Sequence, residues 1–82
     1  MRGYPNPATD RAVISYELAR GSEVSCKVYD AAGNHVEDIF DGYQPAGAHS
    51  LRWNSSAVSP GVYFCELETA TDKRAVRIVR TR

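Results

Sequence analysis

Apolar and polar residues alternate with a period of two along most of this chain, and that alternation constrains the fold more than any other feature. The segment from Arg11 to Leu18 shows it clearly, because its even-numbered residues are apolar or aromatic (Ala12, Ile14, Tyr16 and Leu18). Turn-forming residues interrupt the pattern about every eight to twelve positions. A period of two with such turns is typical of β-strands in a sandwich and excludes a helical fold.

Six strands and an extended edge segment account for the pattern. We expect the edge segment at 4–7, where prolines disfavour a central strand, and strands at 11–18, 23–30, 35–40, 48–53, 61–69 and 73–80. Val24, Cys26 and Val28 should face inward in the second strand, and Leu51 and Trp53 should share a face. In the last strand Ala75 or Val76 should face inward with Ile78.

Two loops and one strand carry specific expectations. Residues 30–34 should form a hairpin in which Gly33 takes a positive φ and Asp30 bonds backbone groups two residues on. Residues 41–47 contain two glycines and a proline and are predicted to be a loop. The strand at 61–69 begins with consecutive apolar residues, which predicts burial on both sides at that end.

Packing two sheets together buries far more apolar surface than one sheet can, and 82 residues cannot close a large barrel. The sequence therefore predicts an all-β, immunoglobulin-like β-sandwich of about seven antiparallel strands, with residues 1–82 as a single domain.

Composition argues against several functions. Ten Lys and Arg balance ten Asp and Glu, so we expect no nucleic-acid partner. No apolar run approaches the roughly 20 residues of a membrane span, so no membrane insertion is expected. Met1 leads directly into Arg2 and Gly3, which does not fit a secretory leader. His35 and His49 have no ligand-spaced carboxylates around them, and no serine has an activating histidine, so neither a cofactor, nor a metal site, nor an enzyme activity is predicted.

The two cysteines are separated by 39 positions, which fits no zinc or redox motif. Cys26 and Cys65 both fall in the inward register of their strands. Either they form one disulfide or both are buried free thiols, and a disulfide would suit a small domain in an oxidising compartment.

Five ordered blocks of the chain resemble the type A C-terminal sorting domains of the type IX secretion system. They span almost the entire length and are Tyr4-Pro5-Asn6-Pro7 with 12–16, 28–33 with Val36, Pro45-Ala46-Gly47 with His49 and Trp53, 59–64, and 73–82. These domains are in turn similar to the immunoglobulin-like module of the flagellar hook-capping protein. Asn34, Pro60 and the two cysteines depart from the family pattern without conflicting with the fold.

The resemblance implies a domain that carries an upstream cargo through the periplasm to the cell surface. Its expected partners are the outer-membrane secretion machinery and its shuttle proteins, and a surface peptidase is expected to remove the domain afterwards. The last strand is the expected recognition element, with Lys73, Arg77, Ile78, Val79 and Arg80 as its site residues.

Two other functions remain open at the level of sequence. The domain can instead be a structural module that self-associates through edge strands, using either 4–7 or the last strand. A carbohydrate-binding module would need exposed aromatic residues on one flat face, for which Tyr29, Tyr43 and Phe40 are the candidates.

Overall fold

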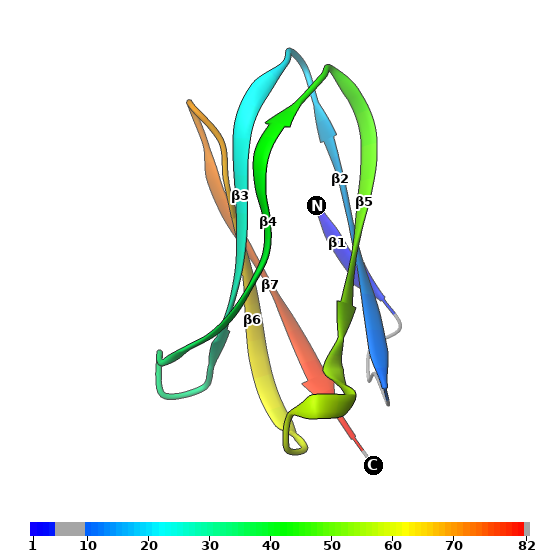
Figure 1. The fold of residues 1–82 in the computed structure, drawn as a ribbon, viewed down its shortest axis with the longest axis vertical. Helices are drawn as coiled ribbons and strands as arrows, with labels where there is room; N and C mark the ends of the chain where they lie inside the picture. The colour runs from blue at the N-terminus through cyan, green and yellow to red at the C-terminus, as the bar shows by residue number, and fades with distance from the viewer. Residues whose placement is uncertain (5–9, 82) are drawn as a thin grey trace.

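Seven strands form two antiparallel sheets that lie face to face in the computed structural model of the chain (Figure 1). The structure describes residues 1–4 and 10–81. In chain order the elements are β1 (Arg2–Tyr4), β2 (Arg11–Leu18), β3 (Ser22–Asp30), β4 (His35–Gln44), β5 (Gly47–Asn54), the 3-10 helix η1 (Ser55–Ala57), β6 (Gly61–Glu68) and β7 (Lys73–Arg80). One sheet has the order β1-β2-β5 and the other the order β4-β3-β6-β7. The predicted seven-stranded β-sandwich is confirmed.

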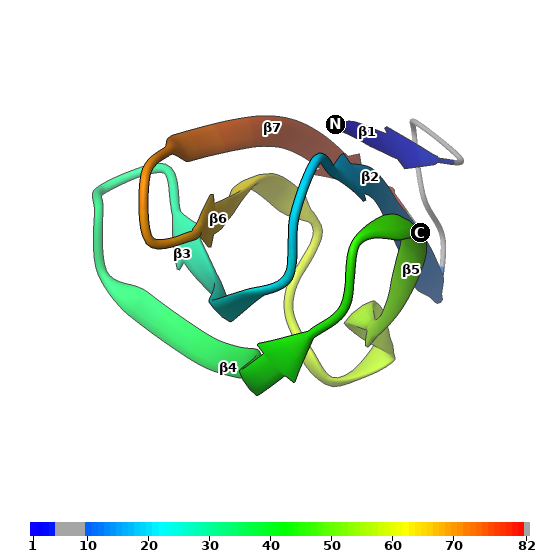
Figure 2. The same ribbon diagram turned by 90° about the horizontal axis from the view of Figure 1, so that it is seen from above.

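The core lies between the sheets, which enclose it when the molecule is seen from above (Figure 2). The inward faces predicted for β2 and β3 are confirmed, because alternate residues of both strands are buried. The buried apolar residues are Ala12, Ile14, Tyr16, Val24, Cys26, Val28, Trp53, Tyr63, Cys65, Leu67 and Ile78. Val76 shares the inward side of β7 with Ile78, so Val76 rather than Ala75 is the inward residue.

The predicted loop at 41–47 is mostly strand, and that prediction was wrong. β4 continues to Gln44, because residues 41–44 pair with residues 22–25 of β3. Gly42 is therefore held extended by a long neighbouring strand, which overrides the weak strand preference of glycine. Only Pro45 and Ala46 separate β4 from β5.

The start of β6 is not buried on both sides, and that prediction was also wrong. Tyr63 is buried, whereas the next residue, Phe64, is 37% exposed on the outer face of its sheet. Strands of an antiparallel sandwich bury one face only, so a continuous apolar run does not imply two covered faces.

The predicted hairpin between β3 and β4 is confirmed. Gly33 has φ 87°, and Asp30 Oδ1 accepts hydrogen bonds from the backbone N–H groups of Ala32 at 3.0 Å and Asn34 at 2.8 Å. Hydrogen bonding, chiefly to the Asn34 N–H, holds the pKa of Asp30 below its ordinary value.

β4 is irregular along its length. Its pairing with β3 shifts register twice, so that Val36 and Ile39 have no direct partner in β3. Both side chains still pack against the core together with Phe40. Such bulges bend a strand and interrupt the regular spacing of its backbone hydrogen-bonding groups.

Of the edge segment predicted at 4–7, the structure describes only Tyr4. β1 pairs with residues 13–15 of β2, which makes it an edge strand. Pro5, Asn6 and Pro7 lie outside the described residues. Within the described part of the chain, no helix is long and apolar enough to cross a membrane.

Candidate functional site

The last strand, β7, is the first candidate because the family resemblance places recognition there. β7 pairs with β6 along its whole length, from Lys73 opposite Glu68 to Arg80 opposite Gly61. It is the terminal strand in the order of the four-stranded sheet. Four of its eight residues are basic and none is acidic. The strand is therefore a cationic margin of the sandwich.

Most of the basic side chains of this strand are held in place by neighbouring groups. Lys73 Nζ lies 3.5 Å from Glu66 Oε1. Arg74 Nε donates to Asp72 Oδ2 at 2.8 Å, and this contact holds the pKa of Asp72 below its ordinary value. At the opposite end Arg80 Nε donates to the Ser55 carbonyl at 2.7 Å, which ties β7 to η1.

The five residues predicted for recognition divide into three groups by burial. Lys73 and Arg77 are exposed, and Val79 and Arg80 are half-buried. Ile78 is fully buried, and its Cδ1 atom would lie 3.0 Å from a Cβ atom placed on Gly3. Ile78 therefore holds β7 against β1 and the core, and the basic residues supply the accessible chemistry of the strand.

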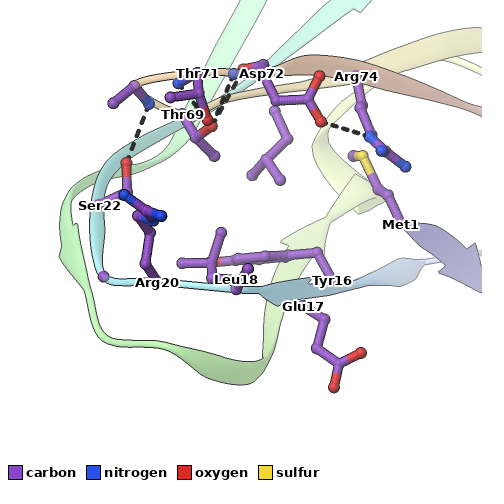
Figure 3. A pocket seen from close by; sticks show the side chains of 14 residues that line it. Met1, Tyr16, Glu17, Leu18, Arg20, Ser22, Thr69, Thr71, Asp72 and Arg74 are labelled. Carbon is purple, nitrogen blue, oxygen red and sulfur yellow. Dashed lines mark hydrogen bonds and ion pairs between the residues drawn. The ribbon is translucent and has the colours of Figure 1, made fainter.

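A cavity of about 650 Å³ lies at the end of the sandwich where β7 begins (Figure 3). Apolar and aromatic side chains from β2, from β6 and from the residue before β1 line it: Met1, Tyr16, Leu18 and Leu67. Charged residues lie around these, among them Arg20 from the β2–β3 turn and the paired Asp72 and Arg74. Its residues thus combine an apolar lining with groups of both charges, a composition suited to a peptide side chain.

Hydrogen bonds hold the turns beside this cavity together. The Ala70 N–H donates to Ser22 Oγ at 3.1 Å, which connects the β6–β7 turn to the start of β3. Within the β6–β7 turn, Thr69 Oγ1 accepts from the Asp72 N–H at 3.1 Å (Figure 3). The sequence predicted both turns but not that they share one end of the sandwich, because that depends on strand order.

Tyr16 has a buried hydroxyl beside the cavity. Its ring is 5% exposed and packs at 5.5 Å, centroid to centroid, from the ring of His49. Its hydroxyl is buried near the side chain of Gln44, but among the described residues no partner is placed for a well-formed hydrogen bond. Burial, together with the Cys26 thiol, raises the pKa of Tyr16 above its ordinary value.

The two cysteines lie on adjacent strands of the four-stranded sheet and are free in the structure. Cys26 pairs with Leu67 and Cys65 with Val28, so the cysteines are diagonal neighbours on the inner face. Diagonal residues in an antiparallel pair are about 7–8 Å apart, whereas the Cβ atoms of a disulfide are about 3.5–4.5 Å apart. Burial raises the pKa of Cys26 to about 11 and that of Cys65 to about 12. A bridge between them stays a prediction, and it would require the strands to shift.

The two histidines make separate contacts. His35 Nε2 lies 2.8 Å from Asp38 Oδ1 in an exposed pair on β4, and His49 Nε2 lies 2.6 Å from the Pro45 carbonyl. Among the residues that the structure describes, no three His, Cys, Asp or Glu side chains form a group that could hold a metal ion.

The three aromatic residues proposed for carbohydrate binding lie apart from one another. Phe40 packs against the core. Tyr29 and Tyr43 lie near opposite ends of the β3–β4 ladder. Tyr29 of β3 pairs with His35, and Tyr43 of β4 pairs with Glu23. Tyr29 and Glu23 are six residue steps apart on β3, which corresponds to about 20 Å.

Comparison with known proteins gives the family. The family described as secretion system C-terminal sorting domain matches residues 2–81 of the chain. No curated protein and no solved structure matches it. The family match covers every strand, including β7 and the turns beside the cavity. The chain therefore belongs to the family of C-terminal sorting domains, which direct proteins through type IX secretion.

Proposed function

We propose that the secretion machinery recognises this domain in its folded form, through the exposed basic residues of β7 and the cavity beside the first residues of that strand. The observation that carries this proposal is the position of β7. It is a cationic edge strand, and its Arg74 also lines the cavity. A partner can contact both features at once, because they are continuous on the surface.

The family gives the wider setting. A type IX sorting domain interacts with that secretion machinery, has a non-catalytic role, and belongs to a cargo that is secreted or reaches the cell surface. Within this setting we assign the recognition to outer-membrane components and shuttle proteins, reached after the cargo has entered the periplasm. An extended acidic segment suits the basic strand best, because opposite charges steer the encounter.

Only a folded domain presents these two features together. Lys73 and Arg74 are oriented by Glu66 and Asp72, and Arg80 is oriented by η1. In an unfolded chain these charges would be spread over a flexible segment and the cavity would not exist. Recognition of the fold therefore also selects cargo whose last domain has folded.

Charge reversal on β7 tests the proposal. In a bacterium with type IX secretion, a reporter fused to this domain should reach the cell surface, whereas Lys73→Glu with Arg77→Glu should trap it in the periplasm. Both residues are exposed, but Lys73→Glu replaces the contact with Glu66 by a like-charge pair. The thermal unfolding midpoint of the double variant is therefore measured first, and it should fall by only a few degrees, which leaves the domain folded during the export assay. Cell fractionation and surface proteolysis measure the distribution.

The matched control reverses charge on the other sheet. Arg11 on β2 and Arg2 on β1 are both exposed, so Arg11→Glu together with Arg2→Glu should leave export unchanged. Normal export of the β7 variant would overturn the assignment to β7.

A truncation that lacks Val79 to Arg82 should also accumulate in the periplasm.

We also propose that a surface peptidase removes the domain after export, as the family resemblance implies. The mature reporter at the surface should then be about 9 kDa lighter than the periplasmic form, which corresponds to loss of the whole 9.1 kDa domain. A surface form that keeps the full mass would refute removal without affecting the role of β7.

A further inference from the structure

The four edges of the two sheets differ in how well they resist pairing with another strand. Unpaired edges promote association between molecules unless they are short, charged, bulged or covered. β1 is only three residues long. β4 is interrupted by two register shifts and carries three acidic residues, Glu37, Asp38 and Asp41. β7 carries four basic residues.

β5 has none of these protections. It is the terminal strand of its sheet, eight residues long, and pairs with β2 in one continuous register from Gly47 to Asn54. It contains no proline, no lysine and no acidic residue, and Arg52 is its one arginine. Among the described residues, no strand pairs with its second edge.

We propose that β5 is a self-association edge, at which two copies of this chain pair antiparallel about a two-fold axis to form one six-stranded sheet. Opposite residues in an antiparallel pair share a face. Outward residues of one β5 must therefore lie opposite outward residues of the other. Ser50 is an outward residue, so it can lie opposite Ser50 of the second copy, on the two-fold axis. That register places residues 47–53 of the two strands opposite one another.

Charges on the outer face favour this register. With Ser50 on the two-fold axis, Arg52 lies opposite Ala48 of the second copy. Ala48 is small, and its partner within its own sheet is Glu17. Arg52 and Glu17 of the second copy are then two strand spacings apart, about 10 Å between backbones, which these two long side chains can cover. The symmetry creates this ion pair twice.

The same charges disfavour the other symmetric pairings. Two β7 strands would bring the four basic residues of each copy to one seam, and two β4 strands would bring together the three acidic residues of each copy. Arg52 and Glu17 do not meet within one copy, because Arg52 pairs with Val13. Arg52 and Glu17 can therefore form an ion pair only between two copies. This inference is independent of recognition through β7.

Sedimentation velocity of the isolated chain over a range of concentrations tests the proposal. A single strand pairing buries less than about 1,200 Å², so we expect a weak monomer–dimer equilibrium. Ser50→Lys places like charges on the axis and should raise the dimer dissociation constant about fivefold. Ala75→Lys adds the same charge at an exposed position of β7 and should leave the dissociation constant unchanged.

Charge exchange tests the register. Arg52→Glu should weaken the dimer, and Arg52→Glu combined with Glu17→Arg should restore it. A chain that stays monomeric up to about 1 mM overturns the proposal, as does an equal loss of dimer in Ala75→Lys and Ser50→Lys. Failure of the exchanged pair to restore association overturns the pairing about Ser50. Thermal unfolding midpoints equal to that of the parent chain show that each variant is folded.

Discussion

The rings of Trp53 and Tyr63 meet edge to face across the core, with their centroids 5.3 Å apart and their planes at 64°. Trp53 belongs to the three-stranded sheet and Tyr63 to the four-stranded sheet. The pair therefore joins the two layers of the sandwich. The Tyr63 hydroxyl also donates to the Ser59 carbonyl at 2.6 Å, which anchors the segment that leads from η1 into β6.

Removal of the indole should cost a large part of the free energy of unfolding. Trp53 is fully buried, and Trp→Ala in a core costs about 3–5 kcal/mol. A domain of 82 residues has a total free energy of unfolding of only about 4–12 kcal/mol. Tyr63→Phe, which keeps the ring and loses one hydrogen bond, should cost about 1 kcal/mol. Urea unfolding followed by circular dichroism measures both, and an unchanged midpoint in Trp53→Ala would show that the tryptophan does not hold the sheets together.

Substitution of Gly33 should destabilise the β3–β4 hairpin by a smaller amount. At φ 87° a side chain with a Cβ is strained, so Gly33→Ala should cost about 1–2 kcal/mol. Gly33→Asn should recover part of that loss, because asparagine adopts positive φ more readily. The two free energies of unfolding, compared under the same conditions, test the order. An alanine variant as stable as the parent would argue against a positive φ at this position.

The Asp30 carboxylate should make stability depend on pH. Its pKa is lowered in the folded state by hydrogen bonds, chiefly from Asn34. The stabilisation is therefore fully present above the unfolded pKa of about 3.9 and is lost as the pH falls through the folded pKa. Asp30→Asn should flatten the decline in stability below about pH 4. Equal declines in both proteins would contradict the contribution of Asp30.

The two buried thiols should resist alkylation in the folded domain. Burial raises the pKa of Cys26 to about 11 and that of Cys65 to about 12, so both stay protonated near neutral pH, and the thiolate is the reactive form. Iodoacetamide at pH 8 should label neither cysteine in the native state and both in urea, as mass spectrometry can show. Rapid native labelling would refute this protection. A pair that stays unlabelled in urea until reductant is added would instead demonstrate the alternative, a disulfide.

Local patterns in the sequence predicted the parts of the fold that depend on neighbouring residues. The inward faces of β2 and β3 follow from strict alternation, and the hairpin at Asp30 and Gly33 follows from the chemistry of a turn. The extension of β4 through Gly42 could not be predicted in this way. Its extended form depends on pairing with Val24, and that partner is set by the length of β3 rather than by local preference.

The candidate site was predictable only in part. The basic character of β7 is visible in the sequence, whereas the burial of Ile78 against Gly3 requires β1 and β7 to be neighbours in space. The cavity near Tyr16 was missed for the same reason, since two turns distant in sequence form it. The exposure of Phe64 depends on which face of β6 the second sheet covers.

Strand order also determines how the domain acquires its structure. The β3–β4 and β6–β7 pairs are hairpins between consecutive strands, whereas the β2–β5 ladder joins Arg11 to Asn54 and the β3–β6 ladder joins Ser25 to Glu68. Closing such long loops is entropically unfavourable before the contacts form, which slows the folding of β-sandwiches to milliseconds or longer. The two hairpins can therefore form early and independently, and the sandwich closes only when both distant ladders assemble around them. Until those ladders form, the apolar faces of both hairpins stay exposed to water, and a single two-stranded hairpin is at best marginally stable there.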